Sequence, residues 1–247
     1  MCASEFLTGR PGLVHAFTMR GFNVSLKSGP DAAATGDRRR RLCEALGLDF
    51  AKLTCAAQVH GAEIVPVDDK MAGSGADGGT PPIPHVDGMV TDRKGVVLLA
   101  TSADCPIVLV FDPERRALGM AHAGWRGTIA GITGRLVQQM RRCFGCRSEA
   151  MLAGVAPCAG RGRYEVQTDV VRVAAARWDD YEHFFEVREG RTFFDLRSAN
   201  LAQLQAAGVP EEQIDVADVC TIQDDRFCSY RRDGAAGGHA ALVAALI

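Results

Sequence analysis

A run of four strand-like segments between residues 88 and 121 constrains the fold of this chain more than any other feature. Each segment is short and apolar, and together they occupy residues 88–92, 96–101, 107–111 and 117–121. The loop HAGWRG follows, and Thr128 then has the character of an N-cap for a helix that ends near residue 143. Four strands in succession depart from the regular βαβ alternation of doubly wound folds, so the pattern favours an α+β fold with mixed sheets.

Strand and helix patterns also mix irregularly in the rest of the chain. Further strands are expected at residues 151–155, 192–195 and 214–219, and further helices at 38–48, 169–177 and 196–207, the last ended by Gly208. The four arginines at residues 38–41 are expected on a solvated helix face. Residues 68–86 are rich in Gly and Pro, which predicts a surface loop that could border a pocket. We expect the whole chain, residues 1–247, to form one domain.

Composition and charge argue against several classes of protein. An apolar fraction of 47% with a net charge of −2 is not that of a disordered chain, and 28 basic against 30 acidic residues leave no cationic excess for nucleic acid. The apolar runs fall far short of the ~20 residues that span a bilayer, and the N-terminal segment lacks a secretion pattern. We therefore expect a cytoplasmic monomer with nine reduced cysteines, small-molecule partners, and neither nucleic acid nor membrane as a partner.

Three potential metal ligands lie where apolar strands meet loops: His60 in QVHG, Cys105 in SADC and His122 in MAHAGWRG. Two imidazoles and a thiolate are common zinc donors, and three protein ligands leave a fourth position open for water. Their long spacings do not by themselves bring them together. Each therefore also has a plain structural interpretation, as a packed histidine or an inert buried thiol.

The neighbours of these residues favour a pocket. Asp104 precedes Cys105, and the run GWRG at residues 124–127 follows the last histidine, so polar groups and glycines stand at strand ends. Arg126 and the backbone N–H groups that begin the expected helix could receive an anion. A strand-to-helix turn with a solvated arginine fits the same residues equally well.

Seven motifs, in order along the chain, carry a family resemblance: QVHG, DGMVT, SADC, AHAGWRG, YEV, FDLRSAN and SYRRDG. Through them most of the chain resembles the laccase-domain or polyphenol-oxidase family, which includes bacterial purine nucleoside phosphorylases and the peptidoglycan editing factor. The resemblance implies a single α+β domain with a layered α/β/β/α arrangement. It also implies that His60, Cys105 and His122 are the metal ligands.

Four segments depart from the family pattern. Pro106 directly follows Cys105, whereas the family has its proline one residue later. Gly162 and Arg163 stand where the family has two cysteines before Tyr-Glu-Val, and Gly238 stands where an arginine is usual. The N-terminal Gly-rich stretch is shortened to GFNVSLKSG. Metal binding is expected to survive these changes, whereas substrate preference could differ.

The resemblance implies a zinc-dependent enzyme that deaminates adenosine and cleaves adenosine and inosine with phosphate. Zinc would activate water for the first reaction. The second needs an anion site beside the glycosidic bond, for which Arg20 and Arg126 are candidates. We expect Cys105, Asp104 and Arg126 to be catalytic. Asp87 and Glu165 are further candidates for acid–base groups or for partners of a metal ligand.

Two other activities fit parts of the same pattern. Copper-dependent oxidation of phenols fits because two histidines and a cysteine match a blue-copper ligand set, although six histidines in all are too few for a four-copper centre. A cysteine-type hydrolase that edits peptidoglycan precursors would use Cys105 as its nucleophile and His122 or His60 as its base. Metal content separates these activities, because a ligated thiolate is not a free nucleophile. A binding module without activity has no peptide groove or exposed amphipathic helix to support it.

Overall fold

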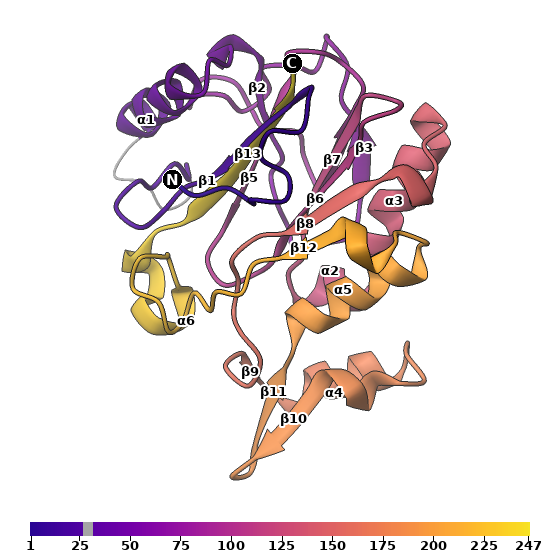
Figure 1. The fold of residues 1–247 in the computed structure, drawn as a ribbon. Coiled ribbons are helices and arrows are strands. Elements are labelled where there is room, and N and C mark those ends of the chain that lie inside the picture. The colour runs from indigo at the N-terminus through magenta and orange to yellow at the C-terminus, as the bar shows by residue number, and fades with distance from the viewer. Residues whose placement is uncertain (27–31) are drawn as a thin grey trace.

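Two β-sheets packed face to face form the centre of the molecule (Figure 1). The computed structural model describes residues 1–26 and 32–247, so the end of the shortened GFNVSLKSG segment lies outside the described residues. The first sheet has the order β1-β13-β5-β2. Its strands are β1 (Leu13–Phe17), β13 (Ala240–Leu246), β5 (Val97–Ser102) and β2 (Leu53–Cys55). The pairs β1–β13 and β13–β5 are antiparallel, whereas β2 runs parallel to β5, so this sheet is mixed.

The second sheet contains the strand block that the sequence indicates most strongly. Its order is β12-β8-β6-β7-β4-β3, with antiparallel pairing in the centre and parallel pairing at both edges. Its strands are β12 (Ile214–Val216), β8 (Leu152–Val155), β6 (Ile107–Asp112), β7 (Ala117–His122), β4 (Gly88–Thr91) and β3 (Ile64–Pro66). All residues of β6 and β7 are buried, which explains their unbroken apolar sequence.

Helices cover the outer faces of both sheets. The helix α1 (Ala32–Ala45) packs on the first sheet, where Leu42 and Cys43 join an apolar cluster with β5 and β13. The helices α3 (Ile132–Phe144) and α5 (Leu196–Ala206) pack on the second sheet. Side chains that face inward from both sheets, such as Leu98, Leu109 and Leu242, form the apolar core between them. The order is therefore α/β/β/α, as the family resemblance implies, and the fold class is α+β.

A small antiparallel sheet projects from one end of this layered body, at the bottom of Figure 1. Its order is β10-β11-β9, and α4 packs beside it. These elements are β9 (Glu165–Val166), α4 (Thr168–Ala175), β10 (Phe185–Arg188) and β11 (Arg191–Phe194). The short helix α6 (Tyr230–Asp233) precedes the last strand. Within the described residues, no helix is long and apolar enough to cross a membrane.

The helix expected from Thr128 to about residue 143 is in fact two helices, and this prediction was wrong in its start. The helix α2 (Trp125–Ile129) comes first, and Gly131 with a φ of 81° separates it from α3. Thr128 lies inside α2, where its hydroxyl donates to the carbonyl of Ala123 (3.0 Å), so it is not an N-cap. The left-handed backbone conformation of Gly131 interrupts the helix, because a right-handed helix cannot continue through it.

The arginine run at residues 38–41 is not wholly solvated, which corrects a second expectation. Arg39 is 3% exposed, and its guanidinium donates to the carbonyls of Val24 and Gly75. A buried guanidinium is tolerated because these backbone acceptors satisfy its N–H groups. The helix also begins earlier and ends earlier than the pattern indicates.

The Gly- and Pro-rich stretch of residues 68–86 contains no helix or named strand, as predicted. It is only partly a surface loop, however, because Ala76 and Ile83 are buried and Ile83 forms a bridge with Ala56. The apolar residues of the loop therefore extend the core, and the end of the loop places Asp87 next to His60 and His122.

Candidate metal centre

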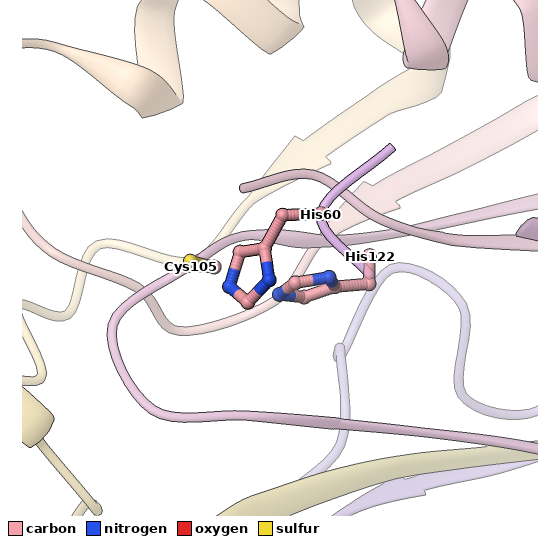
Figure 2. Close-up of side chains that lie close together, drawn as sticks. All are labelled: His60, Cys105 and His122. Carbon is pink, nitrogen blue, oxygen red and sulfur yellow. The ribbon is translucent and has the colours of Figure 1, made fainter. Parts of the chain in front are cut away.

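Three side chains from three separate segments converge at one end of the second sheet (Figure 2). His60 lies in the loop between β2 and β3, Cys105 in the turn between β5 and β6, and His122 at the end of β7. The potential ligand atoms all lie within 4.8 Å of one another. The two imidazole rings meet edge to face, with centroids 4.9 Å apart. The structure therefore brings together the three residues that the motifs single out.

Strand register explains why two of the three side chains meet. In the β6–β7 pair, His122 stands opposite Ile107, two residues after Cys105. The hydroxyl of Ser102 donates to the carbonyl of Cys105 (2.7 Å), which holds the turn between the strands. Cys105 and His122 are 9% and 3% exposed, whereas His60 is exposed. The cluster therefore has a buried floor and an opening on the side of His60.

The carboxylate of Asp87 fixes two of the potential ligands at once. It accepts hydrogen bonds from the backbone N–H groups of Val59, His60 and Gly61, at 3.0, 3.0 and 2.7 Å. Its Oδ1 also lies 2.9 Å from Nδ1 of His122. This bond orients the ring so that Nε2 is the nitrogen available to a metal. Asp87 thus fixes the backbone of the His60 loop and selects the tautomer of His122.

Glycines in HAGWRG are required by the close approach of the His60 loop. A Cβ on Gly124 would lie 2.6 Å from Cδ2 of His60 and 3.5 Å from Sγ of Cys105. A Cβ on Gly127 would lie 2.4 Å from the carbonyl oxygen of Gly61. Any side chain at these positions would push the loop away, so the glycines are part of the cluster's construction.

Charges around the cluster shift three pKa values. Burial acts to raise the pKa of Asp87, but the hydrogen bond and charge of His122 and the backbone donors lower it overall. Burial acts to lower the pKa of His122, but Asp87 and Cys105 raise it to about 9. Burial acts to raise the pKa of Cys105, but hydrogen bonds and charge from His122 and His60 lower it to about 7. The site therefore favours a thiolate, the form that binds metals.

Asp104 supports the cysteine from a strained backbone position. Its φ is 82°, and its carboxylate accepts hydrogen bonds from the hydroxyl of Thr221 (2.7 Å) and the backbone N–H of Arg231 (2.8 Å). Its own carbonyl accepts from the N–H of Ala159 (2.8 Å). Three distant segments therefore meet at the residue before Cys105. The sequence singles out Asp104 but does not reveal these partners.

The other charged residues singled out from the sequence lie in different surroundings. Arg126 is exposed, and its guanidinium stacks 4.1 Å above the ring of Trp125 at the start of α2. Arg20 forms an ion pair with Asp233 (3.5 Å), and Glu165 forms one with Arg191. Neither Glu165 nor Arg20 belongs to the cluster of potential ligands.

The sequence does not single out two further residues, Tyr164 and Arg231, which the structure brings into contact near Asp104. Tyr164 is 7% exposed, and the guanidinium of Arg231 lies 4.3 Å above its ring. Tyr164 belongs to the motif YEV and Arg231 to SYRRDG, so the family motifs mark both positions. The motifs alone do not show that the two residues contact each other.

The departures from the family pattern are accommodated locally. The carbonyl of Pro106 accepts a hydrogen bond from the N–H of Ala123 (2.8 Å), which ties the two strand ends together. Gly162 and Gly238 have φ values of 65° and 67°, so both occupy backbone conformations that suit glycine. Arg163 donates its N–H to the carbonyl of Gly160.

The fold and the cluster define an α+β protein with a potential His-Cys-His metal centre at the end of a double-sheet core. The chain belongs to the family described as multi-copper polyphenol oxidoreductase laccase, whose model matches residues 4–246.

Curated relatives and a solved structure agree with this assignment. A purine nucleoside phosphorylase from Deinococcus radiodurans is 38% identical over 234 residues, which cover 94% of this chain and 84% of that protein. Purine nucleoside phosphorylase YlmD from Geobacillus stearothermophilus is 35% identical over 214 residues, covering 85% and 78%. Its crystal structure matches with a TM-score of 0.89 at 30% identity, over 99% of this chain and 94% of that one. Adenosine deaminase RL5, from an unknown prokaryotic organism, is 32% identical over 222 residues, covering 88% and 84%.

Proposed function

We propose that this protein is a zinc-dependent purine nucleoside enzyme with two reactions. In the first, adenosine and water give inosine and ammonia. In the second, adenosine or inosine and phosphate give the free purine base and ribose 1-phosphate. The convergence of His60, Cys105 and His122 carries the proposal, and the names of the relatives, phosphorylases and an adenosine deaminase, support it.

The donor set fits a zinc ion. Ligand atoms of a tetrahedral zinc site with bonds of about 2.0–2.3 Å stand roughly 3.4–3.6 Å apart, so atoms already within 4.8 Å need only small rotations. The lowered pKa of Cys105 supplies a thiolate, and the Asp87 bond leaves Nε2 of His122 available. Zinc held by these residues would supply Lewis-acid activation of water at the open fourth position.

The remaining residues have distinct proposed roles. Asp87 orients His122 and holds the loop of His60, while Asp104 holds the turn that presents Cys105. With both carboxylate oxygens engaged, Asp104 acts as a positioning residue in this proposal. Arg126 remains a proposed contact for the phosphate of the second reaction, because it is exposed on the segment next to the cluster.

A cysteine-type hydrolase is the second candidate, because the same side chains also form a Cys-His-Asp series. Asp87 contacts Nδ1 of His122, and His122 in turn lowers the pKa of Cys105. A metal-free protein could use this series for nucleophilic attack on an amide of a cell-wall precursor. Copper oxidation has less support: within the described residues, one group of three or more potential donors is found, whereas a multi-copper centre needs several.

Elemental analysis and product identification test these functions together. The protein is purified without added metal, its metal content is measured, and it is then incubated with adenosine or inosine with and without phosphate. We expect close to one zinc ion per chain, inosine from adenosine in either case, and free base plus ribose 1-phosphate only with phosphate. A metal-free protein that hydrolyses a peptidoglycan precursor would establish the hydrolase instead. Stoichiometric copper with phenol oxidation would establish the oxidase.

A further inference from the structure

The two arginines of SYRRDG have different environments. Arg232 is saturated with hydrogen bonds, because its guanidinium donates to the carbonyls of Thr221 (2.7 Å) and Phe227 (2.7 Å) and to the carboxylate of Asp233 (2.7 Å). These bonds close the loop that precedes α6. The role of Arg232 is therefore structural, whereas no comparable set of bonds holds the guanidinium of Arg231 within the described residues.

A backbone hydrogen bond fixes the position of Arg231, while its charged side chain stays accessible to a ligand. Its N–H donates to Asp104 (2.8 Å), the residue before Cys105, so the start of α6 is tied to the metal-ligand turn. Its guanidinium lies 4.3 Å above the ring of Tyr164, and the residue is exposed. In the part of the chain that the structure describes, no carboxylate forms an ion pair with it.

Stacking on Tyr164 orients the guanidinium without neutralising it. A guanidinium has several N–H donors, so a hydrogen bond to the Tyr164 hydroxyl leaves others that match the oxygens of a phosphate. Tyr164 is buried and lies near both Cys105 and Arg231. Burial and the charge of Cys105 raise the pKa of its hydroxyl, while a hydrogen bond to Arg231 acts in the opposite direction. Tyr164 therefore contacts the guanidinium of Arg231 and also feels the charge of Cys105.

We propose that Arg231 binds the oxyanion of inorganic phosphate during nucleoside cleavage, and that Tyr164 is the positioning residue that holds its guanidinium. This inference rests on the proposed function and assigns a further phosphate contact to a residue whose backbone N–H is bonded to Asp104, the neighbour of Cys105. Arg126 lies on a different segment, α2, and has no bond to Asp104. Its proposed contact with phosphate is therefore independent of that of Arg231. The deamination reaction has no phosphate and does not need Arg231.

Steady-state kinetics of the zinc-loaded full chain test the assignment. Arg231→Ala should raise the KM for phosphate roughly 10- to 100-fold, the loss expected for a charge-assisted hydrogen bond, and leave the kcat of adenosine deamination nearly unchanged. Arg231→Lys should recover part of the phosphate affinity, because it restores the charge without the planar fork. Tyr164→Phe keeps the ring and should raise that KM only a few-fold, whereas Tyr164→Ala should approach the effect of Arg231→Ala.

Arg40→Ala is the matched control. Arg40 is exposed on α1, which packs on the outer face of the first sheet, and its guanidinium lies 4.2 Å above the ring of Phe50, so its removal should change neither reaction. Circular dichroism and thermal melting verify that each variant is folded. An unchanged KM for phosphate in folded Arg231→Ala would overturn the proposal.

Direct binding separates this inference from the proposed function. Inorganic phosphate is titrated into the zinc-loaded protein by calorimetry, without nucleoside. Binding that is lost in Arg231→Ala but retained in Arg40→Ala supports the anion site even where the wild-type protein cleaves no nucleoside. Phosphorolysis by the wild type combined with equal phosphate binding by Arg231→Ala would refute the site and leave the function standing. Absence of both activity and phosphate binding in the wild type would refute both.

Discussion

The carboxylate of Asp87 joins two of the three potential metal ligands. It accepts hydrogen bonds from three backbone N–H groups of the His60 loop and contacts the ring of His122, and its own side chain is buried. Hydrogen bonds of this kind orient the ligands of a metal site, so the loss of Asp87 should change metal affinity even though Asp87 is not itself a ligand.

Asp87→Asn should weaken zinc binding roughly 10- to 100-fold, because an amide oxygen cannot accept all four bonds and the NH₂ group opposes the backbone donors. The measurement is competition with a chromophoric chelator. Asp92→Asn, which changes an exposed carboxylate on the same stretch of chain, is the control and should bind zinc normally. Equal zinc affinity in both variants would show that Asp87 supports the fold only.

Gly124→Ala should disturb His60 directly. The new Cβ would lie 2.6 Å from Cδ2 of the ring, too close for any real contact, so the imidazole must move. We expect zinc affinity to fall on the order of 10-fold or more. Gly134→Ala makes the same change where the nearest atom is 4.0 Å away, and it should leave zinc affinity intact while stabilising α3 by up to about 1 kcal/mol. Normal zinc binding by Gly124→Ala would mean that the His60 loop adapts freely.

The ionisation of Cys105 gives a prediction for the metal-free protein. Burial acts to raise its pKa from 9.0, but the two histidines bring it to about 7, so the thiolate should dominate above that pH and disappear below it. The ionisation of Cys105 is measured as a function of pH by ultraviolet thiolate absorbance. The absorbance of the Cys105→Ala variant is subtracted from that of the wild-type protein. In Asp87→Asn the midpoint should move upward, because His122 loses the partner that favours its charge. A wild-type midpoint near 9 would contradict the electrostatic account.

At the scale of elements, a polar network locks the helices that follow the cluster. The amide of Asn200 in α5 donates to the hydroxyl of Thr128 in α2 (3.0 Å) and accepts from that of Thr133 in α3 (2.6 Å). Gln203 adds a bond to the carbonyl of Thr128 (2.8 Å). The broken helix α2–α3 is thus held as one unit by side chains from a third helix.

Asn200→Ala should lower the free energy of unfolding by about 1–3 kcal/mol, because it leaves the buried hydroxyl of Thr133 without an acceptor and removes the donor to the hydroxyl of Thr128. Urea unfolding followed by circular dichroism measures the change. Gln205→Ala removes an exposed polar side chain from the same helix and should be nearly neutral. A neutral Asn200→Ala would indicate that water replaces the amide.

At the scale of the whole molecule, the three potential metal ligands lie outside the main apolar layers. The layers between the sheets and under α1 and α3 contain residues that are almost wholly buried, such as Leu98, Leu118 and Val137. These layers account for the stability of a chain of this length without a metal. The cluster, in contrast, opens to solvent on the side of His60.

Cys105→Ala should therefore abolish zinc binding and deamination but lower the melting temperature by only about 2–4 °C, equivalent to ~1 kcal/mol. Calorimetry and elemental analysis check both parts. Cys158→Ala is the matched control: this thiol is also buried, and it lies outside the ligand group, so the variant should retain its zinc. Loss of zinc in Cys158→Ala would show that the wrong thiol has been assigned.

The amino-acid sequence alone determined the elements with strong local signals. The apolar runs of β4 to β7 are bounded by turn residues, so their positions were predicted within about two residues, and the same holds for α5, which ends before Gly208. The strand β13 was missed, because an alanine-rich segment after glycines has no distinctive period. It becomes a strand through its pairing with β1 and β5, which lie far away in the sequence.

The candidate site also has features that the sequence predicts and features that only the tertiary structure shows. Motif residues and donor types were sufficient to single out His60, Cys105 and His122, since these properties belong to single side chains. Only the tertiary structure decided that Asp87 holds two of them, that Arg39 is buried, and that Arg231 stacks on Tyr164. Each of these contacts joins residues that are distant in sequence, and their approach depends on strand register and helix packing, which no local pattern encodes.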